Sequence, residues 1–204
     1  MEKSCFHLIL LITALLILLH EFNETLMPLL CYENTVLQTG EWWRLLSGHL
    51  IHLSWTHLIL NLASLWILAI TLFQNEKSLT LLLYIFMLAT GISFGLLTFS
   101  PDIAWYVGMS GVIHGLIVIG ATTNFRSNPG IAVLLIIGIT AKLLWEQFYS
   151  GSHAMEIAIG GKIVSDAHLY GAVSGVIIIS LLKLIPLLKY SHNKSFVQHG
   201  VLKD

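Results

Sequence analysis

Long apolar runs, separated by short polar segments, organise the whole chain. The runs without Asp, Glu, Lys or Arg are residues 4–20, 45–75, 78–101, 103–125, 127–141 and 167–182. A helix needs about 20 mostly apolar residues to cross a bilayer. If the last two runs continue past Lys142 and Lys183, the pattern predicts six spanning helices, at residues 4–20, 50–73, 79–99, 110–123, 130–148 and 167–188.

The composition excludes a soluble protein. Hydrophobic types make up 56% of the 204 residues and charged types 10%, whereas a soluble domain carries about 25% charged residues. Ten Lys and Arg against eleven Asp and Glu give a net charge of −1, so there is no basic surface to hold a nucleic acid. We therefore predict an all-α polytopic membrane protein, with one domain over residues 1–189 and a polar tail over residues 190–204.

The basic residues predict the orientation of the six spans. Residues 4–20 are expected to stay as a helix, because Glu2 precedes the run and no small-residue cleavage site follows it. With the N-terminus inside, seven basic residues lie on the inner side: Lys3, Lys77, Arg126, Lys183, Lys189, Lys194 and Lys203. Only Arg44, Lys142 and Lys162 lie on the outer side. This excess predicts that both termini are cytoplasmic.

A first group of polar residues lies at the outer start of the second span. His57 and Asn61 are four residues apart, so a helix presents them on one face. They could serve a site, or they could form hydrogen bonds between helices, as polar residues in membrane bundles do. A metal site with His49 and His52 is disfavoured, because gaps of three and five residues do not share one helical face. We expect neither a metal nor a cofactor.

A second group surrounds Ser110. This serine follows Gly108 and starts the fourth span, where a helix offers free backbone N–H groups and the positive end of its dipole. That setting suits a nucleophile beside a developing oxyanion, although Ser110 could also be a simple helix N-cap. Gly111 and Gly115 form a Gly-x-x-x-Gly face that lets another helix approach closely.

A third group lies at the outer start of the last span. Gly171 and Gly175 form a second Gly-x-x-x-Gly face, and His168 precedes Gly171 by three residues on the same side. Two helices that meet on glycine faces would bring His168 and the Ser110 hydroxyl within hydrogen-bond reach. The three groups together therefore indicate one catalytic geometry, which helix packing alone does not explain.

Four motifs, in this order, resemble those of the rhomboid family of intramembrane serine proteases. They are Trp43-Arg44, then His57 with Asn61, then Gly108, Ser110 and Gly111, then Ala167, His168, Gly171 and Gly175. The resemblance covers residues 41–175. It implies a six-helix core with a Ser–His dyad, without an acidic third member, in a water-filled cavity open to the outside.

The resemblance also implies a role for each residue. Ser110 is the nucleophile and His168 the general base, while His57 and Asn61 stabilise the oxyanion. Asp166 is not expected to join the dyad, because two residues before His168 it points about 200° away around the helix. His114 is expected beside His168 as a supporting ring, and His52 is expected to brace the outer loop. Trp43 and Arg44 are expected to anchor the protein at the membrane interface.

Two departures indicate a subgroup. His114 stands where many rhomboids have Tyr, and Gly48 stands where they often have His, with His49 shifted by one. The small core and the Ser-Gly-x-x-His string resemble rhombosortases, which are thought to act on bacterial surface proteins with a Gly-Gly tail, an apolar helix and a basic end. This implies a bacterial inner-membrane enzyme with its active site facing the periplasm, a transmembrane protein as substrate, and no nucleic acid. The alternatives are a housekeeping rhomboid, a non-catalytic rhomboid-like binding protein, and a transporter or metal-handling protein.

Overall fold

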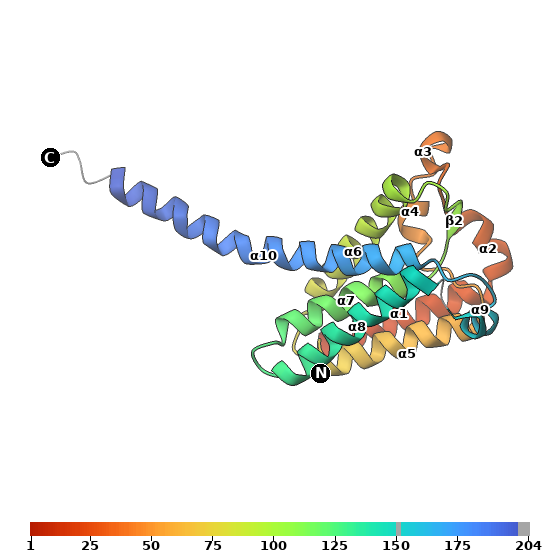
Figure 1. Cartoon of the computed structure of the whole chain (residues 1–204), viewed down its shortest axis with the longest axis horizontal. Coiled ribbons are helices and arrows are strands. Elements are labelled where there is room, and N and C mark those ends of the chain that lie inside the picture. Colours follow the sequence, from red (N-terminus) through yellow and green to blue (C-terminus); the bar gives the residue numbers. More distant parts are fainter. Residues whose placement is uncertain (150–151, 200–204) are drawn as a thin grey trace.

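A computed structural model describes residues 1–149 and 152–199, and helices dominate it (Figure 1). Six of these helices overlap the six predicted spans: α1 (Lys3–Glu21), α5 (Trp55–Thr71), α6 (Ser78–Phe99), α7 (Ser110–Thr123), α8 (Pro129–Tyr149) and α10 (Ser165–His199). By length and composition, α1, α6, α8 and the Ser165–Leu184 part of α10 can cross a membrane, and α5 and α7 are shorter apolar helices. The chain is therefore a mostly helical, polytopic membrane protein.

The last helix continues beyond the predicted end of the membrane domain. α10 runs without interruption through His199 and projects away from the other helices (Figure 1). A helix satisfies its own backbone hydrogen bonds, so it can continue after the apolar pattern has ended. Residues 200–204 of the predicted tail lie outside the described residues, and the domain boundary at residue 189 stays a prediction.

The two longest connections between the apolar helices, α1 to α5 and α8 to α10, contain short elements that the hydrophobic pattern does not predict. The first holds α2 (Asn23–Leu30), β1 (Tyr32–Glu33), α3 (Val36–Thr39) and α4 (Arg44–Ser47), and the second holds α9 (His153–Ile159). β1 pairs antiparallel with β2 (Trp105–Tyr106), with Tyr32 opposite Tyr106. This pairing ties the first connection to the segment that leads into Ser110.

Gly48 allows this connection to pack tightly. A Cβ atom at Gly48 would lie 2.6 Å from the backbone nitrogen of Tyr32, and the Gly48 carbonyl accepts a hydrogen bond of 3.0 Å from the Gly108 N–H. Any side chain at position 48 would push β1 away. The departure from the rhomboid pattern at this position therefore has a local packing reason.

Arg44 holds the same connection from inside. Arg44 is 5% exposed, and its guanidinium donates hydrogen bonds to the Glu41 carboxylate (2.9 Å) and to the Cys31 carbonyl (3.1 Å). The prediction that Arg44 anchors the protein at the membrane interface is wrong, because the buried Cys31 carbonyl and the partly buried Glu41 carboxylate hold its side chain inside the connection. Trp43 stays half-exposed and donates to the Leu29 carbonyl, so it can still lie at an interface.

The centre of the bundle is the contact between α7 and α10, where glycines of one helix lie against glycines of the other. A Cβ atom at Gly111 would lie 2.6 Å from the Ala167 carbonyl oxygen, and one at Gly115 would lie 2.7 Å from that of Gly171. In return, a Cβ atom at Gly171 would overlap the Gly111 carbonyl oxygen, and one at Gly175 would lie 2.8 Å from that of Gly115. The two predicted Gly-x-x-x-Gly faces therefore meet backbone to backbone, which fixes the N-terminal ends of both helices side by side.

Candidate active site

Ser110 and His168 meet at the N-terminal end of this glycine contact. The Ser110 Oγ lies 2.8 Å from the His168 Nε2. Ser110 is the first residue of α7, and His168 is the fourth residue of α10. Gly108, which leads into α7, has a φ of +112°, and a Cβ atom there would lie 2.6 Å from the His57 ring. A glycine is therefore required for the turn that presents Ser110 to the cavity.

A carboxylate determines which nitrogen of the neutral His168 ring carries the proton. The Glu146 Oε2 lies 2.8 Å from the His168 Nδ1, and an ionised carboxylate can only accept a hydrogen bond. The ring proton therefore sits on Nδ1, and Nε2 keeps its lone pair. The Ser110 hydroxyl then donates to Nε2, which is the arrangement that a general base needs.

Glu146 is the residue that sequence reasoning missed. The predicted dyad lacked an acidic third member, and the structure corrects this by placing a buried glutamate from α8 against His168. Asp166, by contrast, accepts from Ser100 and Gln147 and does not contact His168. A signal was present in the sequence, because an acidic residue inside an apolar span is costly and requires a partner.

His114 lies where the sequence places it, one turn after Ser110. Its ring stacks on the His168 ring, with centroids 4.1 Å apart and planes 10° from parallel. Its Nδ1 donates to the Ser110 carbonyl over 2.7 Å. The His114 ring therefore packs against one face of the His168 ring, and its hydrogen bond to the Ser110 carbonyl fixes its own orientation on α7.

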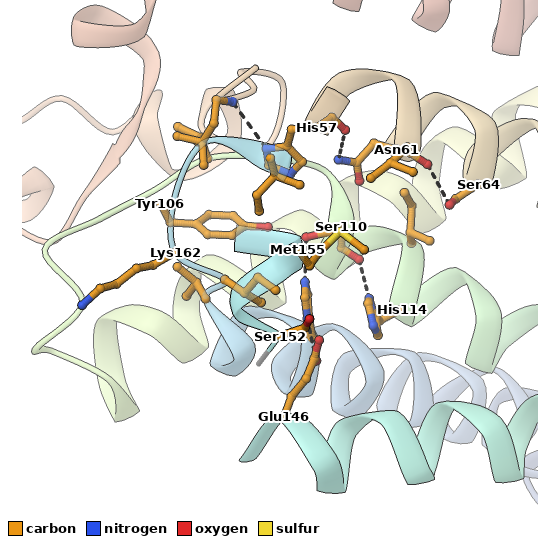
Figure 2. A pocket seen from close by; sticks show the side chains of 18 of the residues that line it. His57, Asn61, Ser64, Tyr106, Ser110, His114, Glu146, Ser152, Met155 and Lys162 are labelled. Atoms are coloured by element: carbon orange, nitrogen blue, oxygen red, sulfur yellow. Dashed lines mark hydrogen bonds and ion pairs between the residues drawn. The ribbon is translucent and has the colours of Figure 1, made fainter. Parts of the chain in front are cut away.

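His57 and Asn61 reach the same cavity from α5. The Leu53 N–H points to the His57 Nδ1 over 3.4 Å, so Nδ1 is the acceptor and Nε2 carries the proton. The Asn61 amide nitrogen donates to the His57 carbonyl over 2.9 Å and keeps a second N–H. Figure 2 shows these two side chains on one side of Ser110 and Glu146 on the other. His57 and Asn61 therefore line the cavity on the side of the nucleophile that lies opposite its base.

These residues surround a cavity of about 430 Å³. Ser110, His57, Asn61 and His168 line it together with apolar side chains that include Trp105, Trp145, Met155 and Val164. A volume of this size can admit a few residues of an extended peptide, and the apolar wall suits a segment that comes from the bilayer.

Two comparisons with known proteins identify the family of this chain. The rhomboid domain family model matches residues 39–184, which is most of the chain. The chain belongs to the rhomboid family. It is also similar to the rhomboid protease GlpG of Haemophilus influenzae, with 26% identity over 179 residues, which cover 82% of this chain and 86% of that protein. The rhomboid prediction drawn from the four motifs is confirmed, and this chain is a rhomboid serine protease homologue. The subgroup stays a prediction.

Among the described residues of this rhomboid, the ring orientations of His114 and His168 do not suit a shared metal ion. His114, Glu146 and His168 form one group with ligand atoms within 4.8 Å of one another. However, imidazole lone pairs lie in the ring plane, and the His114 and His168 rings are stacked almost parallel. One ion cannot lie in both planes, so the group suits hydrogen bonding. Of the earlier metal candidates, His49 is bound to Ser93, and His52 faces His57.

His49 and His52 support the loop that precedes α5. Burial lowers the pKa of His49 to about 4, so its ring is neutral at pH 7. Its Nε2 lies 3.0 Å from the Ser93 hydroxyl, which itself donates to the Leu45 carbonyl, so the ring nitrogen is the donor. His52 packs edge-on against His57, with centroids 5.0 Å apart, and neither of its ring nitrogens has a hydrogen-bond partner among the described residues. His52 therefore contacts its neighbours by packing and not by hydrogen bonding.

Proposed function

We propose that this rhomboid cleaves transmembrane proteins with Ser110 as nucleophile and His168 as general base. The observation that carries the proposal is the 2.8 Å contact between the Ser110 Oγ and the His168 Nε2 at the wall of the cavity. A serine hydroxyl is a weak nucleophile until an adjacent base accepts its proton. This contact provides that base in the required tautomer.

The reaction then follows from these two groups. The Ser110 Oγ–H proton moves to Nε2 as the Oγ–C bond to the scissile carbonyl forms. When the tetrahedral adduct collapses, the C–N bond breaks and the proton on Nε2 passes to the leaving amine. Water then gives a proton to the same Nε2 as its oxygen bonds to the ester carbon. When this second adduct collapses, the C–Oγ bond breaks, Nε2 returns the proton to the Ser110 Oγ, and the carboxylic acid product leaves.

His57 and Asn61 are proposed to stabilise the oxyanion together with the Ser110 backbone N–H. Loss of one such donor typically costs on the order of 100- to 1000-fold in kcat. We therefore expect Asn61→Ala to lower kcat by about 100-fold or more, with a smaller change in KM. The measurement is steady-state cleavage of a fluorescent transmembrane substrate in detergent or nanodiscs. A fall in kcat/KM that came only from KM would place Asn61 in substrate binding instead.

The proposed topology has six spans, with both termini in the cytoplasm. The six apolar helices and the excess of inner basic residues support it. In this orientation the Ser110 end of α7 and the His168 end of α10 face the periplasm of a bacterial inner membrane. Cysteine accessibility on the two sides of the membrane, at positions in the connections, would test the assignment.

For the substrate we propose a C-terminal transmembrane tail that begins with a Gly-Gly pair, as in rhombosortases. A helix hides its carbonyls by hydrogen-bonding them, so a protease can attack only where the helix unwinds. Glycine lowers the stability of a helix by about 1 kcal/mol relative to alanine, so a Gly-Gly pair makes local unwinding easy. The Ser-Gly-x-x-His string and the stacked His114 ring support the subgroup.

A competition between matched substrates tests this proposal. One surface-protein tail carries Gly-Gly before its apolar helix and basic end, a second carries Leu-Leu at the same place, and a third is a generic single-span protein. We expect kcat/KM for the Gly-Gly tail to exceed the other two by at least about tenfold. Equal or faster cleavage of the generic protein would contradict the rhombosortase assignment and favour a housekeeping rhomboid, to which the similarity to GlpG of Haemophilus influenzae also points.

A further inference from the structure

A continuous chain of polar contacts extends from Ser110 through His168 into α8. The Ser110 Oγ contacts the His168 Nε2 at 2.8 Å, and the His168 Nδ1 contacts the Glu146 Oε2 at 2.8 Å. The other carboxylate oxygen, Oε1, contacts the Lys142 Nζ at 2.5 Å. Each oxygen of Glu146 therefore has one partner, and the chain joins three helices.

Glu146 is the one charged residue among the buried residues described on α8. The buried residues of α8 are Ala132, Ile139 and Glu146, which are seven residues apart and form one stripe along the helix. The first two are apolar, as expected for a stripe that packs against the bundle. Burying a carboxylate at the third position requires a compensating partner, and an apolar residue would pack there without that need. Packing alone therefore does not account for Glu146.

We propose that Glu146 is a positioning residue for the His168 base, and this rests on the proposed protease function. The carboxylate keeps the proton on Nδ1, so that Nε2 is free to accept the Ser110 proton. It also stabilises the imidazolium that forms when that proton arrives. No proton moves to Glu146, which stays ionised throughout the reaction because each of its oxygens has its own partner, the His168 Nδ1–H on one and the Lys142 ammonium on the other.

Lys142 and Glu146 act on the imidazolium in opposite directions. The charged and titratable groups around His168 are Glu146 and Lys142 on α8, His114 on α7 and His57 on α5, with Asp166 on its own helix. The negative charge of Glu146 favours the imidazolium, and the positive charge of Lys142 disfavours it. Neutralising Glu146 and neutralising Lys142 should therefore shift the pH dependence of catalysis in opposite directions. If the ion pair only stabilised the fold, neither change would shift it.

The test measures kcat/KM against pH for the wild type, Glu146→Gln and Lys142→Gln in detergent. Gln at 146 keeps the size and an acceptor oxygen but removes the charge. We expect its maximal kcat/KM to fall by at least about 100-fold, because removing the charge of a triad carboxylate costs up to about 10⁴-fold in other serine proteases. We also expect the pH of half-maximal kcat/KM to fall in Glu146→Gln and to rise in Lys142→Gln.

A matched control separates this effect from a general change of charge. Asp166→Asn removes an acidic group two residues from His168 that contacts Ser100 instead, and we expect its pH profile to match the wild type. Cleavage by the wild type together with unchanged kcat/KM and pH profile in Glu146→Gln would overturn the inference while leaving the proposed function intact. Absence of wild-type cleavage and of Ser110 labelling would instead contradict the proposed function.

A spectroscopic measurement tests the contact without any substrate. In protein with ¹⁵N-labelled histidine, we expect a downfield His168 Nδ1–H resonance that disappears in His168→Ala and moves upfield in Glu146→Gln. The same resonance should persist in Asp166→Asn and in Lys142→Gln, so the inference stays testable if Glu146→Gln is too unstable to assay. A His168 ring with its proton on Nε2 in the wild type would overturn the inference.

Discussion

Ser110→Ala and His168→Ala are each expected to lower kcat/KM for a transmembrane substrate by at least about 10⁴-fold, with the fold unchanged. The Oγ and the Nε2 are 2.8 Å apart and act as one unit, so the loss of either removes the activated nucleophile. For the same reason, the double variant should be no slower than either single variant. The measurement is cleavage rate in detergent, alongside circular dichroism and size-exclusion chromatography.

Ser180→Ala is the matched control for this prediction. Ser180 is exposed on α10 and bonds only to the Val176 carbonyl of its own helix. We expect wild-type cleavage from this variant. Cleavage within about tenfold of the wild type in folded Ser110→Ala would contradict the assignment of the nucleophile and would favour a different site or a non-catalytic binding role.

Gly171→Ala is expected to have the largest effect on stability. Its Cβ atom would overlap the Gly111 carbonyl oxygen, and both atoms belong to helix backbones that cannot shift alone. Overpacking of a closed core usually costs about 1–3 kcal/mol, and we expect the upper end of that range in the free energy of unfolding. Separation of α7 from α10 would also lengthen the contact between Ser110 and His168, so cleavage should fall even in the folded fraction.

Gly138→Ala on α8 is the control for the glycine contact. Outside its own helix turn, no atom of the described residues lies within 4 Å of the Cβ position at Gly138, and alanine favours a helix by about 1 kcal/mol over glycine. Unfolding of both variants in a denaturing detergent series gives the comparison. Equal stability of Gly171→Ala and Gly138→Ala would contradict the backbone-to-backbone packing of α7 on α10.

The long apolar helices were predictable because crossing a bilayer demands about 20 apolar residues in a row, and such runs stand out in the sequence. The short elements were not, since α3 and α4 have four residues each and their helices depend on contacts such as those of Arg44. Arg44 itself was placed at the interface because a charged residue next to Trp43 suggests an anchor. Its acceptors, Cys31 and Glu41, become visible only when the connection folds back on itself.

The close approach of Ser110 and His168 was predictable because both residues adjoin a glycine face, and two such faces can meet in few ways. Glu146 was not predicted, because the family resemblance implied a dyad and directed attention to Asp166, the nearest acid in the chain. The contact depends on the rotation of α8, which brings the stripe of Ala132, Ile139 and Glu146 against the bundle. That rotation is a property of packing, and only the lone carboxylate in an apolar span hinted at it.

The most direct test of the account is covalent labelling of the purified protein with a fluorophosphonate, which reacts with activated serines. The modified residue is identified by mass spectrometry in the wild type, Ser110→Ala and His168→Ala. The account predicts one adduct on Ser110 in the wild type, none in Ser110→Ala, and labelling at least about 1000-fold slower in His168→Ala. An adduct on another serine, or labelling of Ser110 that does not depend on His168, would contradict it.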